Sequence, residues 1–273
     1  MLTALLRSLR TGVVTIRYPD EPAQPPARFR GAPRVQPGAV MATLPPPSVC
    51  PSGAIAGGPS HYAIDRARCL YCGLCAETSL DGSIALGRQV ELGVRKRESL
   101  VVEVESDADG RAVALPAPPP AEQVAEQIQR TLGRSLQLRH LDSGSCNACD
   151  WELTALLNPV YDVRRLGIDF LASPRHADGV IVTGPMTRNL ELAARRTYAA
   201  VPEPRVVIAV GACASSGGIV GRGYASAGGV AEVLPVDVFI PGCPPRPEAI
   251  IFGILLAVGR SVRRLIPSPR YSM

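Results

Sequence analysis

The sequence predicts an α/β protein in which a mostly parallel β-sheet is covered by helices on both faces, preceded by a smaller α+β unit. Three observations support this prediction. After residue 121, short and almost continuously apolar runs alternate with helical patterns, which is typical of parallel strands buried on both faces. Four of the eight cysteines fall within residues 50–75, where hydrophobic periodicity is weak. The other four follow apolar runs of the second half, so each half contains a candidate metal site.

Residues 1–47 are predicted to form a basic N-terminal segment followed by a proline-rich strap. Residues 1–40 contain six arginines and two acidic residues, which account for +4 of the formal net charge of +5. The first turns suit an anionic membrane surface or an acidic partner, and a frayed, solvated terminus is an equally good interpretation. The leucines at helical spacing are Leu2, Leu5, Leu6 and Leu9. Residues 21–47 are rich in proline and are expected to run extended.

Residues 48–106 are predicted to form a unit organised around metal rather than around a large apolar core, with one strand at residues 100–104. Residues 107–120 combine Asp-Ala-Asp-Gly with several prolines and are predicted to be a linker. Residues 121–273 are predicted to form the sheet domain. Its strands are expected at residues 136–141, 164–170, 179–183, 205–210 and 236–240. Its helices are expected at residues 121–132, 151–157, 189–200 and 247–258.

The cysteines are expected to bind metal in a reducing compartment. The first 14 residues contain only a short apolar stretch, interrupted by Arg7 and Arg10, and no small-residue cleavage site. Clustered thiols without a secretory signal usually hold metal rather than form disulfides. The longest apolar run near the end, residues 249–259, is well short of the roughly 20 residues that span a bilayer. We therefore expect a cytoplasmic protein, with no membrane-spanning segment and no nucleic-acid partner.

The first cysteine set is a closely spaced triplet. Cys69, Cys72 and Cys75 have the C-x2-C-x2-C spacing with which bacterial ferredoxins hold three corners of a [4Fe-4S] cluster. In two-cluster ferredoxins the run continues x3-C-P, and this fourth cysteine ligates the other cluster. Ser79 stands at that position here. The missing dipeptide occurs upstream as Cys50-Pro51.

Cys50 lacks the three companions that a second ferredoxin cluster would need. Their expected positions hold Val40, Thr43 and Pro46. One half of a two-cluster ferredoxin is therefore erased, and Cys50 is predicted to complete a single cluster with the triplet. A structural zinc site also uses four thiolates, but zinc usually takes its ligands as two separate pairs. Free thiols are a third interpretation.

The second cysteine set is predicted to gather at one edge of the sheet. Cys146 and Cys149 follow the first predicted strand of the sheet domain, and Cys213 and Cys243 follow the last two. Ligands of open α/β sheets bind at the carboxyl ends of the strands, at a switch point in strand order. Glycines around Cys213 would let the backbone approach a cluster and direct N–H groups at its sulfur atoms. Nucleotide binding by this glycine-rich segment is disfavoured, because the Lys-Ser/Thr of a phosphate loop is absent.

Three segments resemble the small subunit of membrane-bound, energy-converting [NiFe] hydrogenases, such as that of formate hydrogenlyase, and the homologous 20 kDa subunit of complex I. They are residues 143–152 (SGSCNACDWE), 211–214 (GACA) and 241–248 (PGCPPRPE). Residues 1–105 similarly resemble the ferredoxin-like subunit of these complexes, through residues 15–19 (TIRYP), residues 29–31 (FRG) and the cysteines. The chain therefore looks like a fusion of two neighbouring subunits.

The resemblance implies a flavodoxin-like sheet domain, an N-terminal ferredoxin-like domain and two [4Fe-4S] clusters. It also implies an electron-transfer subunit of an oxidoreductase whose catalytic centre lies in a partner, a hydrogenase-like or complex I 49 kDa-like large subunit. Other iron-sulfur or membrane subunits would place the chain peripherally on the cytoplasmic face of the inner membrane. In the complex I relatives the first two ligands are adjacent cysteines, whereas Asn147 and Ala148 separate them here, which favours the hydrogenase branch.

The same residues are compatible with two other functions. A large subunit without nickel would give a complex that reduces quinone or another acceptor. A zinc-stabilised scaffold without a redox role belongs to a different class. Glu152, three residues after Cys149, is a candidate proton relay, although a helix N-terminal acid is the plainer interpretation. Trp151, the single tryptophan, is expected to anchor an interface or the core.

Overall fold

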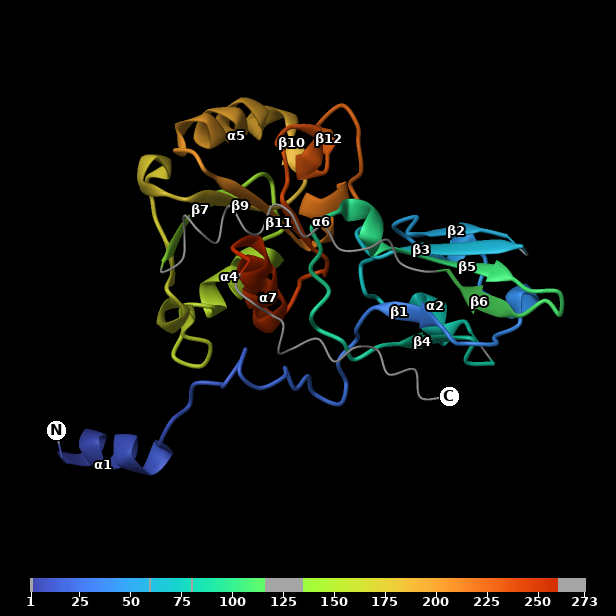
Figure 1. Ribbon diagram of the computed structural model, residues 1–273, viewed down its shortest axis with the longest axis horizontal. Helices are drawn as coiled ribbons and strands as arrows, with labels where there is room; N and C mark the ends of the chain where they lie inside the picture. The colour runs from blue at the N-terminus through green and yellow to red at the C-terminus, as the bar shows by residue number, and fades with distance from the viewer. Residues whose placement is uncertain (1, 59, 80, 116–134, 260–273) are drawn as a thin grey trace.

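The computed structural model describes residues 2–58, 60–79, 81–115 and 135–259. The second half of the chain forms an α/β unit, and residues 33–115 form a smaller antiparallel unit beside it (Figure 1). Helix α1 (Leu2–Thr11) stands away from both units at the end of an extended segment (Figure 1). The described residues include no helix with the length and apolar character needed to cross a membrane.

The sheet of the α/β unit has five strands, and all of its pairings are parallel. Its spatial order is β13-β11-β9-β7-β8, so that β7, the first strand along the chain, lies between β8 and β9, and later strands add on the β9 side. This is the flavodoxin-like order, with its switch point between β7 and β9. The predicted α/β fold is therefore confirmed. The strands are β7 (Leu136–Asp142), β8 (Ile168–Phe170), β9 (Gly179–Thr183), β11 (Val206–Val210) and β13 (Val238–Ile240).

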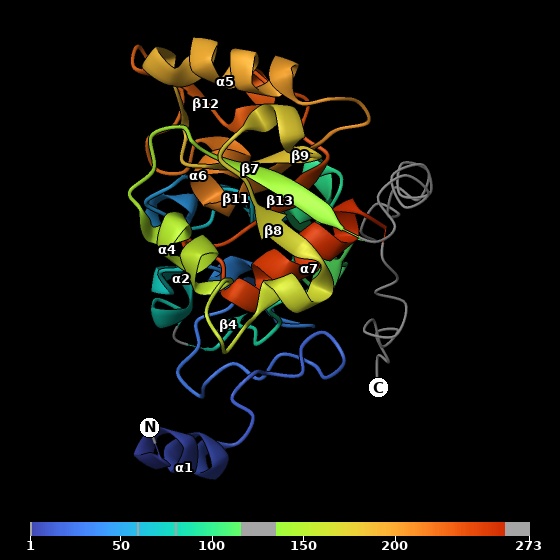
Figure 2. The same cartoon turned by 90° about the vertical axis from the view of Figure 1, so that its left-hand side faces the viewer.

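Helices cover both faces of this sheet because successive strand residues alternate between two cores. In β11, Ile208 and Val210 belong to one core, whereas Val207 and Ala209 belong to the other. Helix α5 (Arg188–Ala200) lies on one side of the sheet, and α4 (Ala148–Ala155) and α7 (Pro247–Ala257) lie on the opposite side (Figure 2). A short helix, α6 (Gly211–Ser216), follows β11 directly. Two short strands pair antiparallel outside the main sheet, β10 (Met186–Thr187) and β12 (Ser226–Gly228).

Gly253 makes a close contact between α7 and the sheet, and Gly253→Ala is expected to destabilise the protein. A Cβ atom at this position would lie 2.3 Å from Cδ1 of Ile240. Overpacking of this kind costs about 1–3 kcal/mol, more than the up to about 1 kcal/mol gained in helix propensity. Urea unfolding should show a lower midpoint. Additive losses in the double variant Gly253→Ala/Ile240→Ala would contradict the proposed clash, because removing the opposing side chain should relieve it.

The smaller unit is an antiparallel sheet with a limited core. Its strand order is β2-β3-β5-β6, and a separate pair joins β1 to β4. Its buried core has nine residues, including Cys75, with Cys50 packed against its edge. The elements are β1 (Pro33–Val35), β2 (Ile55–Gly57), β3 (His61–Asp65), α2 (Leu74–Glu77), β4 (Ile84–Leu86), β5 (Val101–Ser106) and β6 (Ala112–Ala114).

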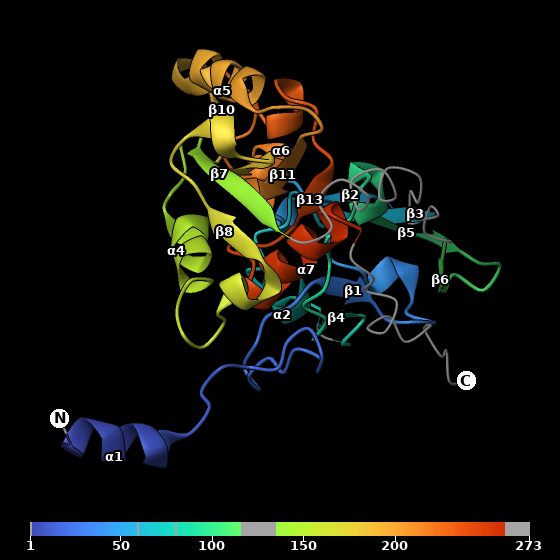
Figure 3. The same ribbon diagram turned by 60° about the vertical axis from the view of Figure 1, so that its left-hand side comes forward.

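The extended strap, taken together with residues 16–20 that precede its proline-rich part, and a crossing segment (residues 87–95) tie the two units together. The Ile16 N–H donates to the Val160 carbonyl at 2.9 Å, and Tyr18 is 2% exposed in a core of the α/β unit. Val94 forms a β-bridge with Phe239 of β13, which lies next to the smaller unit (Figure 3). Leu100 of the smaller unit belongs to the core on the α5 side of the sheet. The two units therefore share hydrophobic cores.

Several elements differ from the prediction. The prediction of a single strand at residues 164–170 is wrong: a 3-10 turn (Val163–Leu166) comes first, and Gly167, at φ 75°, separates it from β8. Residues 107–114 of the expected linker form a hairpin, because β6 pairs with β5. The expected loop around Cys213 is helix α6. The helix expected at residues 121–132 lies outside the described residues. The remaining 3-10 turns are Met41–Thr43, Pro47–Val49, Arg97–Leu100, Pro174–His176 and Val230–Glu232.

Candidate metal centres

The second cysteine set gathers at the carboxyl edge of the parallel sheet. Cys146 lies in the loop after β7 and Cys149 on the first turn of α4. Cys213 lies on α6 after β11, and Cys243 follows β13. Burial raises the pKa of the Cys149 thiol, and the nearby Cys213, Cys243 and Cys146 raise it further. The pKa of Cys213 is raised to about 11, chiefly by burial and then by Cys243 and Cys146. The four thiols are thus close enough to interact.

Two glycines leave space beside these thiols. Gly211 has φ +90°, and a Cβ atom there would lie 2.6 Å from Sγ of Cys149. Gly218 has φ +56°, and its Cβ atom would lie 2.8 Å from Sγ of Cys213. Both positions require a left-handed backbone as well as an absent side chain. The glycines therefore form a cradle in which a group bound to the sulfur atoms has room.

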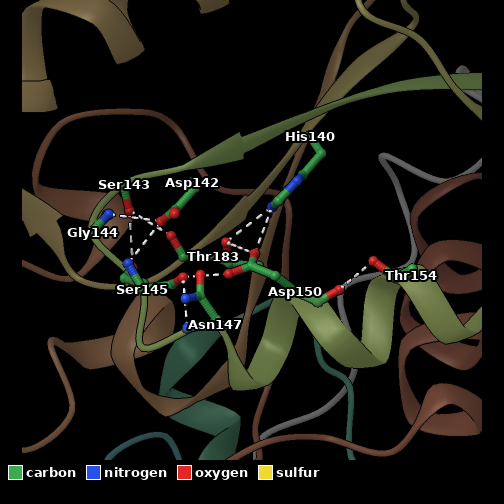
Figure 4. Close-up of polar contacts among 10 residues, drawn as sticks. His140, Asp142, Ser143, Gly144, Ser145, Asn147, Asp150, Thr154 and Thr183 are labelled. Atoms are coloured by element: carbon green, nitrogen blue, oxygen red, sulfur yellow. Dashed lines mark hydrogen bonds and ion pairs between the residues drawn. The ribbon is translucent and has the colours of Figure 1, made fainter.

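A hydrogen-bond network holds the loop that carries Cys146 (Figure 4). The Thr183 hydroxyl donates to Oδ1 of Asp150 at 2.6 Å, and Nε2 of His140 lies 2.9 Å from the same oxygen. The Ser145 hydroxyl donates to the other oxygen of Asp150. Asp142 accepts the N–H groups of Gly144 and Ser145 at 2.9 and 2.7 Å. The loop and the start of α4 are thereby fixed to the ends of β7 and β9.

The second set is partly exposed, and exposed apolar side chains lie near its cysteines along the chain. Cys146 and Cys243 are exposed, in contrast to the buried Cys149. Several apolar side chains close to these cysteines along the chain are exposed. Exposed apolar patches are typical of surfaces that bind other proteins. The exposed side chains are Trp151 (74% exposed), Ile219 (62%), Val220 (61%) and Tyr224 (100%).

The first cysteine set lines one cavity. All four predicted residues border it, namely Cys50, Cys69, Cys72 and Cys75. Backbone N–H groups of Ala54 and Tyr71 donate to the sulfur atoms of Cys50 and Cys69, at 3.2 and 3.3 Å. Burial alone would raise the pKa of Cys50, but hydrogen bonds from Ser52 and from neighbouring backbone N–H groups lower it overall. Burial raises the pKa of Cys69 to about 12.

Polar side chains connect the positions where a second ferredoxin cluster would need cysteines. The Ser79 hydroxyl lies 2.7 Å from that of Ser83 and donates to Asp81 at 3.2 Å. The Thr43 hydroxyl donates to the same aspartate. Ser79 also accepts the Ile84 N–H at 3.0 Å. Hydrogen bonds thus join the segments that a cluster would otherwise bridge.

The two cysteine sets are neighbours across the contact between the units. Burial raises the pKa of Cys243, and Cys146 of its own set and Cys72 of the first set raise it further. A second, more open cavity is bordered by Cys243, Tyr71 and Arg246. Tyr71 also borders the cavity of the first set. This adjacency depends on tertiary packing, and the spacing of the cysteines in the sequence does not reveal it.

Both sets offer sulfur donors alone. Among the described residues, no group of three or more His, Cys, Asp or Glu side chains is placed to hold a single metal ion. All-thiolate donors, backbone N–H groups directed at sulfur and glycines that leave space beside it fit an iron-sulfur cluster, which Cys residues hold four at a time.

Glu152 lies half-buried on α4, three residues after Cys149. Burial raises the pKa of its carboxyl group, Arg246 lowers it, and Glu248 raises it again. Arg246 donates two hydrogen bonds to Glu248, at 2.9 and 3.2 Å, and Glu248 is only 5% exposed. This buried pair was not predicted from the sequence. The signal that marks it is the charged Arg-Pro-Glu sequence that begins an otherwise apolar helix.

A flavodoxin-like sheet with sulfur donors at its switch-point edge defines an iron-sulfur subunit of an oxidoreductase. Comparison with known proteins supports this class: residues 146–257 match the family described as NADH ubiquinone oxidoreductase, 20 kDa subunit. The chain belongs to this family.

The relatives include subunits of several oxidoreductase complexes. The chain is 42% identical over 139 residues to the "Probable membrane-bound hydrogenase subunit mbhJ" of Pyrococcus furiosus, covering 51% of this chain and 83% of the relative. It is 39% identical over 153 residues to formate hydrogenlyase subunit 7 of Escherichia coli, covering 56% and 60%. It is 47% identical over 107 residues to a subunit of the NADH-quinone oxidoreductase of Citrifermentans bemidjiense, covering 39% and 62%. The chain therefore covers about three fifths of the length of each of the last two relatives.

Proposed function

We propose that the chain is an electron-transfer subunit with two [4Fe-4S] clusters in a membrane-associated, [NiFe]-hydrogenase-like complex. The observation that carries this proposal is the pair of adjacent four-cysteine sets, of which the second is partly exposed. Cys50, Cys69, Cys72 and Cys75 would hold the first cluster. Cys146, Cys149, Cys213 and Cys243 would hold the second.

The side chains and backbone of this protein would set the properties of both clusters. Each cluster supplies a site that gains and loses one electron. The N–H groups of Ala54 and Tyr71 direct hydrogen bonds at the first set, which favours the more negative, reduced state. Burial of Cys69 and Cys149 keeps water from one side of each set. The exposed edge at Cys146 and Cys243 leaves the second set accessible to a partner.

Metal analysis of the purified complex tests the cluster assignment. We expect about eight irons and eight inorganic sulfides for this chain, and EPR signals from two reduced clusters. One zinc ion for each cysteine set would instead support a zinc-stabilised scaffold and refute the redox function.

The domain division is part of the proposal. We propose residues 1–47 as the basic segment and strap, which contributes β1 to the smaller unit, and 48–106 as a ferredoxin-like single-cluster domain. Residues 107–120, which contribute β6, are proposed as the connection, and 121–273 as the sheet domain. The resemblance of residues 1–105 to ferredoxin-like subunits supports a fusion of two subunits in one chain. Through its partners, including other iron-sulfur or membrane subunits, the chain would lie peripherally on the cytoplasmic face of the inner membrane.

The large subunit is proposed to cover the exposed apolar side chains that lie near the second set along the chain, with Trp151 as its anchor. Trp151→Ala is expected to weaken binding by at least about 2 kcal/mol, or about 30-fold, because exposed tryptophans at interface centres are typical hot spots. The affinity of the purified chain for the large subunit measures this effect. Leu192→Ala is the control, because this exposed residue lies on α5 on the other side of the sheet. Equal losses for the two variants would contradict the assignment.

Glu152 is proposed to relay protons between the partner's active site and solvent. Burial raises the pKa of its carboxyl group, which brings proton exchange closer to neutral pH than for an ordinary glutamate. Glu152→Gln is expected to reduce proton-dependent turnover of the complex about 100-fold, with both cluster EPR signals retained. The exposed Glu232→Gln provides the control. Unchanged turnover in Glu152→Gln would leave this glutamate as a helix N-terminal acid.

A quinone-reducing complex without nickel is the alternative. The 47% identity to a subunit of an NADH-quinone oxidoreductase favours it. Nickel analysis of the co-purified large subunit separates the two functions. A large subunit without nickel and without two C-x2-C pairs would refute the hydrogenase function.

A further inference from the structure

Tyr71 occupies the contact between the two cysteine sets. It stands between Cys69 and Cys72 in sequence and borders the cavity of the first set. It also borders the second cavity, of which Cys243 of the second set forms another wall. Leu70, its neighbour in the same loop, borders the first cavity but not the second. Of the two residues between Cys69 and Cys72, Tyr71 is therefore the one that faces both sets.

The electrostatic surroundings of Tyr71 agree with this position. Burial raises the pKa of its phenol, the nearby Cys69 raises it further, and Cys243 makes a smaller contribution in the same direction. Cys72 contributes in turn to the raised pKa of Cys243. The phenol thus lies within electrostatic range of a thiol from each set.

Tyr71 occupies this position at a cost in stability. Its hydroxyl is buried and has no hydrogen-bond partner among the described residues, a situation that costs about 1–3 kcal/mol. Its backbone is left-handed, with φ 56°, which is uncommon for a residue other than glycine. The left-handed backbone belongs to the ligand loop, because the Tyr71 N–H donates to the Cys69 sulfur at 3.3 Å, but the unpaired hydroxyl makes no contact with a ligand. Tyr71 therefore forms a wall that the cavity of the first set and the cavity beside Cys243 share.

We infer that the ring of Tyr71 is the bridge between the two clusters: it keeps water in the open cavity beside Cys243 from reaching the first set, and it carries the electronic coupling between the sets. This inference rests on the proposed function. In electron transfer between the two clusters, the reduced cluster loses one electron and the other cluster gains it. No bond forms or breaks, and the hydroxyl proton stays in place. The ring performs this function, and the hydroxyl has no part in it.

Three variants of the full chain, in its purified complex, separate the ring from the hydroxyl. Tyr71→Phe keeps the ring and removes the unpaired hydroxyl. Tyr71→Asn removes the ring with a residue that tolerates the left-handed backbone. Leu70→Ala is the matched control, because it changes the same loop but not the wall that the two cavities share. Iron content and the EPR signals of both clusters are measured first, followed by the rate of electron equilibration between them after flash reduction and by both reduction potentials.

The variant that keeps the ring and the control are expected to behave like the wild type. Tyr71→Phe and Leu70→Ala should equilibrate within about twofold of the wild-type rate, with potentials unchanged. Tyr71→Asn should equilibrate more slowly. Water reaching the first set should also shift the relative reduction of the clusters about tenfold, or about 59 mV for a one-electron couple. If Tyr71→Asn fails to hold the first cluster, Tyr71→Leu, which lacks a ring but remains apolar, takes its place with the same expected slowing.

Two results would overturn the inference. One is slow equilibration in Tyr71→Phe, which would assign the function to the hydroxyl. The other is a wild-type rate in the variants without a ring. A wild-type protein that lacks either cluster would refute the proposed function instead, so the two failures are distinguishable.

Discussion

Gly211→Ala is expected to eliminate the second cluster and leave the first in place. The substitution puts a methyl group 2.6 Å from the Cys149 sulfur and forces alanine into a backbone with φ +90°. The backbone strain alone costs about 1–3 kcal/mol, and the clash displaces a ligand from its position. Iron content should fall from about eight to about four, and one of the two reduced-cluster EPR signals should disappear.

Gly221→Ala is the matched control for this variant. Gly221 is also left-handed, with φ +66°, but no atom outside its own chain neighbours lies within 4 Å of an added Cβ. It therefore tests backbone strain without the clash, and both EPR signals should remain. Two intact clusters in Gly211→Ala would contradict the assignment of Cys149 as a ligand beside this glycine. Far-UV circular dichroism and the retained first signal show whether the variant is folded.

Cys149→Ser and Cys72→Ser are expected to remove different clusters. Each set contains four thiols that interact mainly within the set, so losing one buried or half-buried ligand should empty one site. Each variant should retain about four irons, and the EPR signal that survives in one should be the signal that is lost in the other.

The comparison of these two variants tests the grouping of the eight cysteines. Loss of the same signal from both would mean that Cys72 and Cys149 ligate one cluster. Because Cys72 also influences Cys243, the signal that survives in Cys72→Ser is expected to shift slightly. The double variant should contain neither cluster.

The sheet could be predicted because its strands are short, apolar and bounded by turn residues. The strand predicted at residues 179–183 is β9 residue for residue, and β11 differs from its prediction only at Arg205. The strand predicted at residues 164–170 was too long because its first residues, including Arg164 and Arg165, belong to a 3-10 turn, which Gly167 separates from β8. The antiparallel strands of the smaller unit have three to six residues and weak alternation, so their pairing follows from packing rather than from pattern.

The site could be predicted in part. Ligand spacing grouped the first four cysteines, and the rule that sites form at the carboxyl edge of parallel strands grouped the second four. Neither pattern places one set relative to the other. That adjacency depends on contacts such as Val94 with Phe239, which join residues far apart along the chain. The same limit applies to Tyr71 and to the buried Glu248, since their neighbours come from distant parts of the sequence.

The extended strap and the crossing segment should make electron transfer between the cysteine sets insensitive to dilution. Where two electron carriers are separate proteins, the fraction in contact depends on their concentrations and falls as the solution is diluted. Here Tyr18, Val94 and Leu100 pack one unit against the other within a single chain. The encounter between the cysteine sets is therefore intramolecular, with an effective concentration set by the fold. Transfer between them is expected to be first-order and independent of protein concentration.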